Sequence, residues 1–421
     1  MNKPRRRALI LVIAGVVALA IAAAVVVFVV VKPESDSLAA YNAAADELRA
    51  ARLGAEEARL DLVVASEDAI AAATAGTGIA DSTGPAYVSD VATIAAVRTA
   101  AESLVTAAGL TLTDGALVSP PPAAIDDLGA LDAPADRGER VTAAAAMRER
   151  IPGFETAAAD FAAQAEAVAT SAAAVDTAVD ALLASAHTTG IADALPPLAS
   201  AETVSAYTAA VAALAEPAED ADALALMTDY QQAWLAGIAS HEAAARQQGS
   251  VSEPTLIRGV LVANKTYALP SSYGNGLTAE TTDAFAAMKA EAAAAGHKIY
   301  IASGFRSYST QTGLYNRYVA NDGQADADRY SARPGHSEHQ TGLTFDLNTI
   351  TEAFGGTPAG IWVAENAHRF GFVVRYPQGK EEITGYKWEP WHLRYLGVDV
   401  ATKLHDSGLT LEEYLGITSA Y

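Results

Sequence analysis

The stretch RPGHSEHQTGLTFD at residues 333–346, together with EPWH at residues 389–392, decides the fold and chemistry of the C-terminal part of this 421-residue chain. The two stretches contain His339, Asp346 and His392. Two imidazoles and a carboxylate can supply the three protein ligands of a hydrolytic zinc site, which keeps a further position open for water. The chain has 8 histidines, so spacing alone leaves open that these are ordinary buried polar residues.

The residues between these positions favour convergence on one site. Gly342 permits a sharp turn ahead of Asp346. Asp346 lies in the apolar, strand-like run Leu343–Leu347, where a carboxylate is costly unless it is paired or bound to a metal. If His392 binds zinc, Glu389, which precedes it closely, lies beside the activated water. It could then accept the water proton and pass it to a leaving amine.

The surrounding sequence predicts an α+β domain. β-branched and aromatic residues become more frequent after a polar linker at residues 247–254. Short strands are predicted at 261–262, 298–301, 343–347 and 372–375. A helix is predicted from Thr278 to Ala295, with Thr278 as its N-cap and Gly296 ending it. We therefore predict that residues 251–421 form a catalytic domain in which helices cover a small mixed or antiparallel sheet.

The order of these motifs resembles that of the VanY-like D-alanyl-D-alanine carboxypeptidases, a family of zinc peptidases. The family pattern Ser-x-His-x-x-Gly-x-x-x-Asp, followed by Glu-x-Trp-His, appears here at residues 337–346 and 389–392. SGFRS at 303–307 and GFVVRYP at 371–377 extend the match. The resemblance covers roughly residues 255–415 and not the region before them.

The resemblance implies a metal centre and a reaction. His339, Asp346 and His392 match the ligands of a Zn²⁺ ion, and Glu389 matches the catalytic base. The implied reaction is that of a D,D-carboxypeptidase. Metal-activated water would hydrolyse the C-terminal D-alanyl-D-alanine bond of peptidoglycan stem peptides.

The resemblance also implies a substrate site. Arg306 matches an arginine that contacts the substrate carboxylate or the developing oxyanion, and a charged, planar set of donors suits either task. Gln311 and Ser337 match polar positions that line the site. Two alternatives stay open: an L,D-carboxypeptidase acting on tetrapeptide stems, and a non-catalytic module that binds or senses the cell wall. The intact ligands and base argue against the second.

Residues 34–250 predict an alanine-rich, all-α region. Apolar residues recur at spacings of three and four from Tyr41 to Ala69 and from Phe154 to Ala186, which is typical of helices that bury a narrow seam. TGIAD occurs at 77–81 and again at 189–193, each time after a long helical pattern that its glycine would stop. We predict a duplicated helical hairpin that serves as a stalk, and a protein partner of this stalk is a further hypothesis.

Residues 1–33 predict a basic cytoplasmic tail and a transmembrane signal-anchor. After Lys3 and Arg5–Arg7, the 24 residues Ala8–Val31 are apolar and uncharged. Such a run can span a hydrocarbon core of about 30 Å. The basic flank stays inside, so we expect a single-pass protein of the cell membrane with an extracytoplasmic catalytic domain. A cleaved signal peptide is the alternative, although its apolar part is usually only about 7–15 residues long.

Composition excludes several classes of function. The net charge of −22 argues against binding to nucleic acid. The chain has no cysteine, which excludes disulfides, thiolate metal ligands and a thiol nucleophile.

Overall fold

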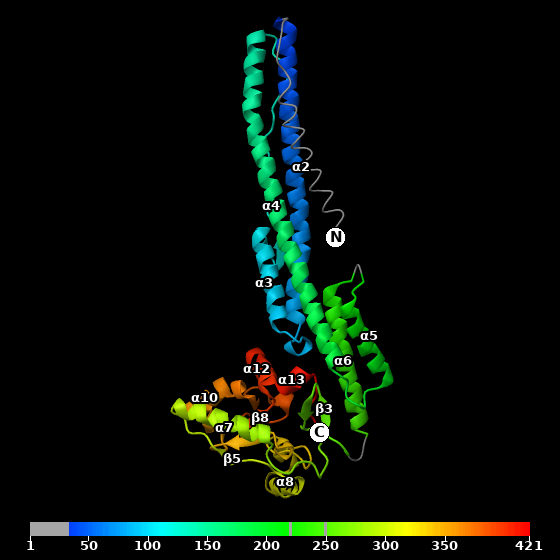
Figure 1. Ribbon diagram of the computed structural model, residues 1–421, viewed down its shortest axis with the longest axis vertical. Helices are drawn as coiled ribbons and strands as arrows, with labels where there is room; N and C mark the ends of the chain where they lie inside the picture. The colour runs from blue at the N-terminus through cyan, green and yellow to red at the C-terminus, as the bar shows by residue number, and fades with distance from the viewer. Residues whose placement is uncertain (1–32, 219–220, 248–250) are drawn as a thin grey trace. The chain divides into compact units, whose positions relative to one another are not determined.

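The computed structural model describes residues 33–218, 221–247 and 251–421 (Figure 1). The predicted anchor at residues 8–31 lies outside the described residues. The described residues divide into two compact units, one formed by residues 33–80 and 95–180 and the other by residues 81–94 and the described part of 181–421. The predicted border of the catalytic domain at residue 251 falls inside the second unit and remains a prediction.

The first unit is built mainly on two long helices, α2 (Pro33–Ser82) and α4 (Arg137–Ala192). They run side by side (Figure 1) and share a buried seam that contains Leu48, Leu62, Phe154 and Val168. The predicted three-four spacing is therefore confirmed. Shorter elements complete the unit: α3 (Ala92–Ala107) and the hairpin of β1 (Thr111–Thr113) and β2 (Ala116–Val118).

The two long helices also resemble membrane spans by composition. Within the described residues, Asp36–Ser82 and Arg137–Ala192 are long and apolar enough to cross a bilayer. Alanine-rich helices of soluble proteins meet the same criteria, and the seam between α2 and α4 shows that their apolar faces are partly used for packing. This is weak support for membrane insertion of these helices.

In the second unit, two further helices follow the second TGIAD copy at residues 189–193. The end of α4 is followed by α5 (Ala201–Ala215) and α6 (Ala223–Ala245), which pack against each other. The expectation that the TGIAD glycines stop their helices is wrong, because α2 continues to Ser82 and α4 to Ala192. Gly190 instead allows close packing, since a Cβ there would lie 2.7 Å from the Val211 side chain. The duplication itself stays a prediction.

Residues from the helical part of the second unit surround the turn of a β-hairpin that belongs to the C-terminal half. The hairpin consists of β3 (Thr255–Ile257) and β4 (Val260–Val262), and Arg258 lies at its turn with a φ of 50°. The Arg258 guanidinium lies 4.2 Å from the ring centre of Trp234 and 4.6 Å from that of Tyr87. It also forms an ion pair with Asp193 at 3.0 Å and donates to the Ala86 carbonyl.

Further contacts tie these helices to the C-terminal half within the second unit. Trp234 Nε1 donates to the Leu415 carbonyl at 2.9 Å. Lys403 Nζ donates to the carbonyl of Val88, in the segment that follows the 3₁₀ turn η1 (Pro85–Tyr87), at 3.3 Å. Helix α6 and the segment after η1 therefore contact the C-terminal half within the second unit, and the predicted stalk role of residues 34–250 stays a prediction.

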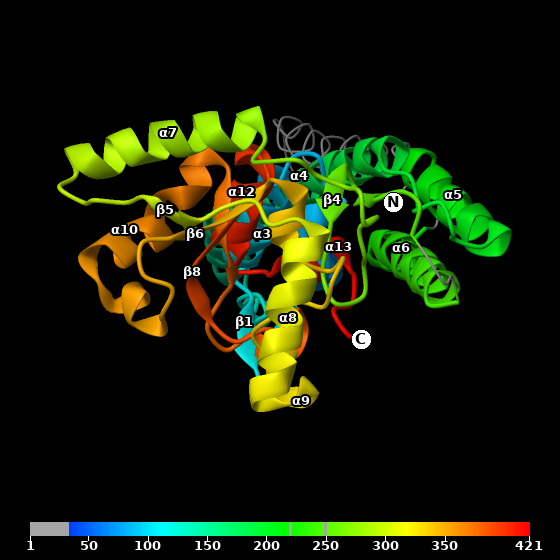
Figure 2. The ribbon, with the colours of Figure 1, turned by 90° about the horizontal axis from the view of Figure 1, so that it is seen from below.

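That fold contains a four-stranded antiparallel sheet with the order β5-β6-β8-β7. The strands are β5 (Ile301–Ser303), β6 (Thr344–Leu347), β7 (Phe372–Tyr376) and β8 (Glu389–Tyr395). Helix α7 (Ala279–Ala294) runs along one side of the sheet (Figure 2), where Phe285 and Met288 pack in a core with Phe345, Phe372 and Leu393. Thr278 caps α7 by accepting from Thr281 N, as predicted.

Other helical elements enclose the sheet and the loops around it. They are α8 (Tyr308–Asp322), α9 (Gln324–Ala327), η2 (Glu338–Thr341), η3 (Glu352–Gly356), α10 (Pro358–Asn366), η4 (Ala367–Phe370), α11 (Glu381–Thr384), α12 (Val398–Ser407) and α13 (Leu411–Leu415). The part of the chain predicted as α+β therefore has a small antiparallel sheet with helices.

The strand predictions are right for β4, β6 and β7 and fail at two places. The run predicted at 298–301 contributes only Ile301 to β5, because the Asn348 side chain bonds the backbone at Lys298 and Tyr300 in place of a ladder. Strand β8 is absent from the predicted strands, and it contains Pro390, which lacks an amide hydrogen and is unusual in a central strand. The ladder between β7 and β8 shifts register beside this proline, which explains how a central strand accommodates it.

Candidate metal and catalytic site

Two neighbouring strands and one turn bring the three predicted ligands together. Asp346 on β6 and His392 on β8 are register partners in the antiparallel ladder. His339 lies on η2, just before the turn at Gly342. Gly342 has a φ of +75°, and a Cβ there would lie 2.3 Å from the Gly276 carbonyl oxygen, so only glycine fits. This turn directs the chain from His339 into β6.

The three side chains offer donor atoms that lie within 4.8 Å of one another. His339 Nε2 lies 3.3 Å from Asp346 Oδ2, and His392 Nδ1 lies 3.3 Å from Asp346 Oδ1. All three residues are buried. Burial would raise the pKa of Asp346, but the two histidines outweigh it and hold this pKa well below its ordinary value. The carboxylate is therefore ionised and ready to bind a cation.

The cluster fits a divalent metal. Asp346 Oδ1 is buried and has no hydrogen-bond partner among the described residues, as expected of an atom reserved for a ligand. The outward nitrogen of each histidine faces an acceptor: His339 Nδ1 lies 2.7 Å from the Gly304 carbonyl, and His392 Nε2 lies 3.4 Å from Glu338 Oε2. Metal-binding histidines in proteins commonly have such outer partners.

Glu389 stands beside this cluster, as predicted for a base. It begins β8, and its Oε2 lies 3.3 Å from His392 Nδ1. Its carboxylate lines the same cavity as the three candidate ligands. It can therefore exchange a proton with a group bound there.

Arg306 lies on the other side of Asp346. Its Nη2 is 4.0 Å from Asp346 Oδ2, and its side chain is 20% exposed. Nη1 donates to Gln311 Oε1 at 2.9 Å, and the Gln311 amide in turn donates to the Ala332 carbonyl at 2.6 Å. Gln311 is fully buried and is not among the residues that line the cavity, whereas Ser337 is. Gln311 is therefore placed to orient Arg306, and its direct contact with substrate stays a prediction.

A cavity of about 310 Å³ opens over the cluster. Besides the candidate site residues, the cavity is lined by Ser331, by Glu338 and by aromatic and apolar side chains: Leu314, Tyr318, Tyr330, Ala332, Ile350, Tyr376, Tyr386 and Trp391. Among the described residues that line it, Arg306 is the single arginine or lysine. The cavity can thus take a small peptide with one anionic group directed at Arg306.

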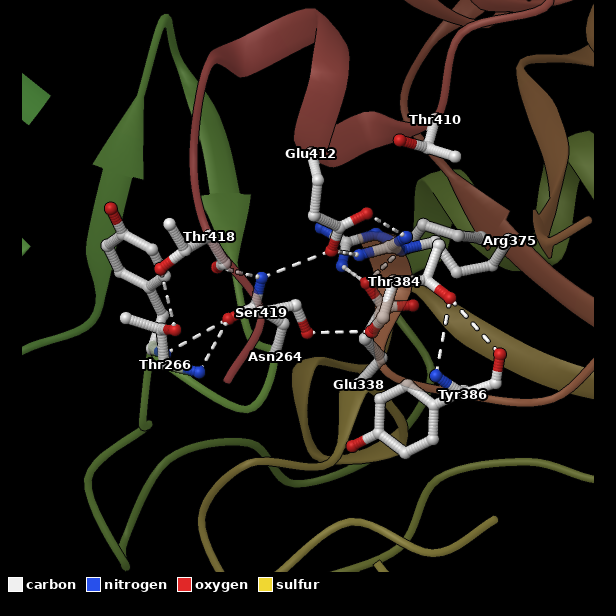
Figure 3. A network of polar contacts seen from close by, with 12 residues as sticks. Asn264, Thr266, Glu338, Arg375, Thr384, Tyr386, Thr410, Glu412, Thr418 and Ser419 are labelled. Carbon is white, nitrogen blue, oxygen red and sulfur yellow. Dashed lines mark hydrogen bonds and ion pairs between the residues drawn. The ribbon is translucent and has the colours of Figure 1, made fainter. Parts of the chain in front are cut away.

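The sequence does not predict the buried charged network that Figure 3 shows around Glu338, Arg375 and Glu412, of which Glu338 also lines the cavity. Glu338 and Arg394 are fully buried beside β6 and β8, as are Arg375 and Glu412. Asn264 donates to Glu412 Oε1 at 3.1 Å and joins the network to the C-terminal segment. The signal was present, because Glu338 stands inside the SEHQTG motif and Arg375 inside GFVVRYP, but their pairing depends on the sheet register.

Comparison with known proteins places the chain in a family. Residues 274–398 match the model of the VanY family, described as D-alanyl-D-alanine carboxypeptidase. The putative carboxypeptidase YodJ of Bacillus subtilis is 39% identical over 36% of this chain, which spans 64% of YodJ. The D-alanyl-D-alanine carboxypeptidase of Enterococcus faecalis is 36% identical over 41% of this chain and 70% of its own length.

A similar solved structure is that of the L,D-carboxypeptidase DacB of Streptococcus pneumoniae, which is 45% identical over 40% of this chain and 95% of its own, with a TM-score of 0.37. The residues matched by the family model, 274–398, include every residue that lines the cavity and all three members of the cluster. The chain therefore belongs to the VanY family of D-alanyl-D-alanine carboxypeptidases, a family of peptidases.

Proposed function

We propose that this protein is a zinc-dependent D,D-carboxypeptidase that removes the terminal D-alanine from peptidoglycan stem peptides. One observation carries the proposal most strongly: the Glu389 carboxylate and the Arg306 guanidinium flank the cluster of His339, Asp346 and His392 inside one cavity. A base, a cation and a metal-binding set are the groups that metal-dependent hydrolysis of a C-terminal peptide bond uses. The D-alanyl-D-alanine carboxypeptidase of Enterococcus faecalis supports the choice of substrate.

Zinc is the metal that this donor set favours. Two imidazole nitrogens and one carboxylate oxygen leave a fourth position open, which is the arrangement of catalytic zinc sites. When bound, zinc would supply Lewis acidity that polarises the scissile carbonyl and lowers the pKa of water. The remaining work falls to the side chains of the chain itself.

Glu389 accepts the proton of the attacking water and delivers it to the leaving amine nitrogen. Its position at the start of β8, beside His392, keeps the carboxylate at the cluster throughout. Arg306 binds the negative charge of the peptide, either its terminal carboxylate or the carbonyl oxygen that gains charge. Gln311 holds the guanidinium in place through Nη1.

The test is digestion of two defined muropeptides by the purified full-length protein. A pentapeptide stem ending in D-alanyl-D-alanine and a tetrapeptide stem are incubated separately, and the products are identified by mass. Loss of one alanine from the pentapeptide alone supports the proposal. Loss of alanine from the tetrapeptide alone would replace it with the L,D-carboxypeptidase alternative, and cleavage of neither would favour a non-catalytic wall-binding module.

We also propose that the enzyme works outside the membrane, anchored by residues 1–33. The support is the run of 24 apolar residues behind a basic cluster. Protease added to intact spheroplasts should remove the cavity-bearing part from the cells. Recovery of the full-length protein after this treatment, or release of the whole protein into the medium, would contradict anchoring with an external site.

A further inference from the structure

We propose that Glu338 is a positioning residue, which holds Nε2 of His392 and so presents Nδ1 of the same ring to the metal. The inference rests on the proposed metal function and deepens it. The Glu338 carboxylate is fully buried and does not belong to the candidate ligand set. Arg375 and Arg394 in turn hold Glu338.

The two oxygens of Glu338 face different partners. Oε1 accepts from Arg375 Nε at 2.8 Å and from Arg394 Nη1 at 2.9 Å. Oε2 faces His392 Nε2 at 3.4 Å and Thr344 Oγ1 at 3.5 Å. The strong, charge-assisted bonds are made by one oxygen, so the carboxylate is fixed while its second oxygen remains available to the histidine.

The His392 ring needs a partner at Nε2. Its Nε2 is buried and makes no hydrogen bond of good geometry within the described part of the chain. Its Nδ1 lies 3.3 Å from both Asp346 Oδ1 and Glu389 Oε2. Flipping the ring would exchange these two environments. A carboxylate at the Nε2 side selects the tautomer that carries its proton on Nε2 and leaves the Nδ1 lone pair for a metal.

The arginines that hold Glu338 are themselves fixed, and Figure 3 shows Arg375 beside Glu412. Arg375 places its Nη1 and Nη2 on the two oxygens of Glu412, at 2.8 and 2.5 Å. Arg394 Nη2 donates to the Leu261 carbonyl at 2.5 Å. Two guanidiniums and two carboxylates balance in charge, which makes their burial possible. The network therefore fixes Glu338 in place. Its charges balance one another without a contribution from the candidate metal ligands.

The test compares Glu338→Gln with Glu412→Gln in the full-length protein. Glutamine has one acceptor oxygen, so at position 338 it can serve the arginines or the histidine but not both. Glu412→Gln weakens the same buried network without touching His392, which makes it the matched control. Zinc affinity is measured by competition with a chromophoric chelator, and the visible spectrum of the cobalt-loaded protein reports the ligand geometry.

We expect Glu338→Gln to weaken zinc binding by about 10–100-fold and to change the cobalt spectrum. Glu412→Gln should change zinc affinity by less than about threefold at a comparable loss of thermal stability. Equal losses of zinc affinity in the two variants would overturn the proposal, because Glu338 would then act only through the fold. Unchanged zinc affinity in Glu338→Gln would overturn it too.

The zinc-affinity measurement also distinguishes failure of this inference from failure of the proposed function. If the unsubstituted protein binds zinc but cleaves neither muropeptide, the proposed peptidase activity fails, while the comparison of zinc affinities still decides the role of Glu338. If the unsubstituted protein does not bind zinc, both proposals fall.

Discussion

Replacing Arg258 with alanine should destabilise the second unit strongly. The Arg258 side chain is 5% exposed, and its removal leaves Asp193, whose side chain is 13% exposed, without this cation. Breaking a buried ion pair from one side typically costs about 3–5 kcal/mol, and the low end applies here because Asp193 is only partly buried. The contact with Trp234 at 4.2 Å would add about 1 kcal/mol or more. For a unit of this size, each kcal/mol lowers the melting temperature by about 2–4 °C, so a fall of roughly 10 °C is expected.

The loss should depend on pH in a defined direction. Burial raises the pKa of Asp193 above its ordinary value, although Arg258 lowers it in part. Without Arg258 this pKa rises further. A carboxyl whose pKa is raised in the folded state favours folding at low pH, and this advantage disappears as pH rises through that pKa. The destabilisation by Arg258→Ala should therefore be largest at neutral pH and shrink as the solution is acidified.

Calorimetry of the purified full-length protein measures this effect, with Arg258→Ala/Asp193→Ala as the control. Removing both charges should restore part of the stability that the single substitution loses, because no unpaired charge then remains. The reasoning is refuted if Arg258→Ala unfolds within about 1 kcal/mol of the unsubstituted protein at pH 7. It is also refuted if the double variant is less stable than the single one.

Three further outcomes are expected. Glu389→Gln should reduce turnover by about 10²–10⁴-fold and leave zinc content unchanged, as measured by peptide hydrolysis and elemental analysis; normal turnover would remove Glu389 from the mechanism. Chelation should abolish hydrolysis, and added zinc should restore it; activity that survives in metal-free protein would exclude the proposed centre. Gly342→Ala should lower thermal stability by more than about 1 kcal/mol, because its Cβ would meet the Gly276 carbonyl at 2.3 Å in a left-handed turn; an unchanged melting temperature would show that the turn can relax.

Residue type makes His339, Asp346 and His392 possible metal ligands, but spacing alone does not select them. The resemblance to the VanY-like family does, and the structure brings the three within 4.8 Å of one another. Gly342 was assigned to a turn for a steric reason that the structure supports. The seam of the long helices was also predictable, since helical periodicity follows directly from the positions of apolar residues.

What could not be predicted depends on pairing across the sheet. Arg375 on β7 and Arg394 on β8 lie on neighbouring strands, and Glu338 reaches both of them from η2, which no local sequence pattern shows. Read singly, each of these charges would be placed at the surface. The role of Gly190 was misread because local sequence cannot show that Val211 packs against it.

The short segment at 81–94 has a consequence for the order in which the protein can mature. It is synthesised early, yet Ala86 is bonded to Arg258, and Val88 is bonded to Lys403 across 315 positions of sequence. Contacts of such long range form late, because a long loop must close before they are made. The unit that holds the candidate site thus cannot be completed until the chain has been synthesised at least as far as Lys403, so peptide cleavage should not begin before that point.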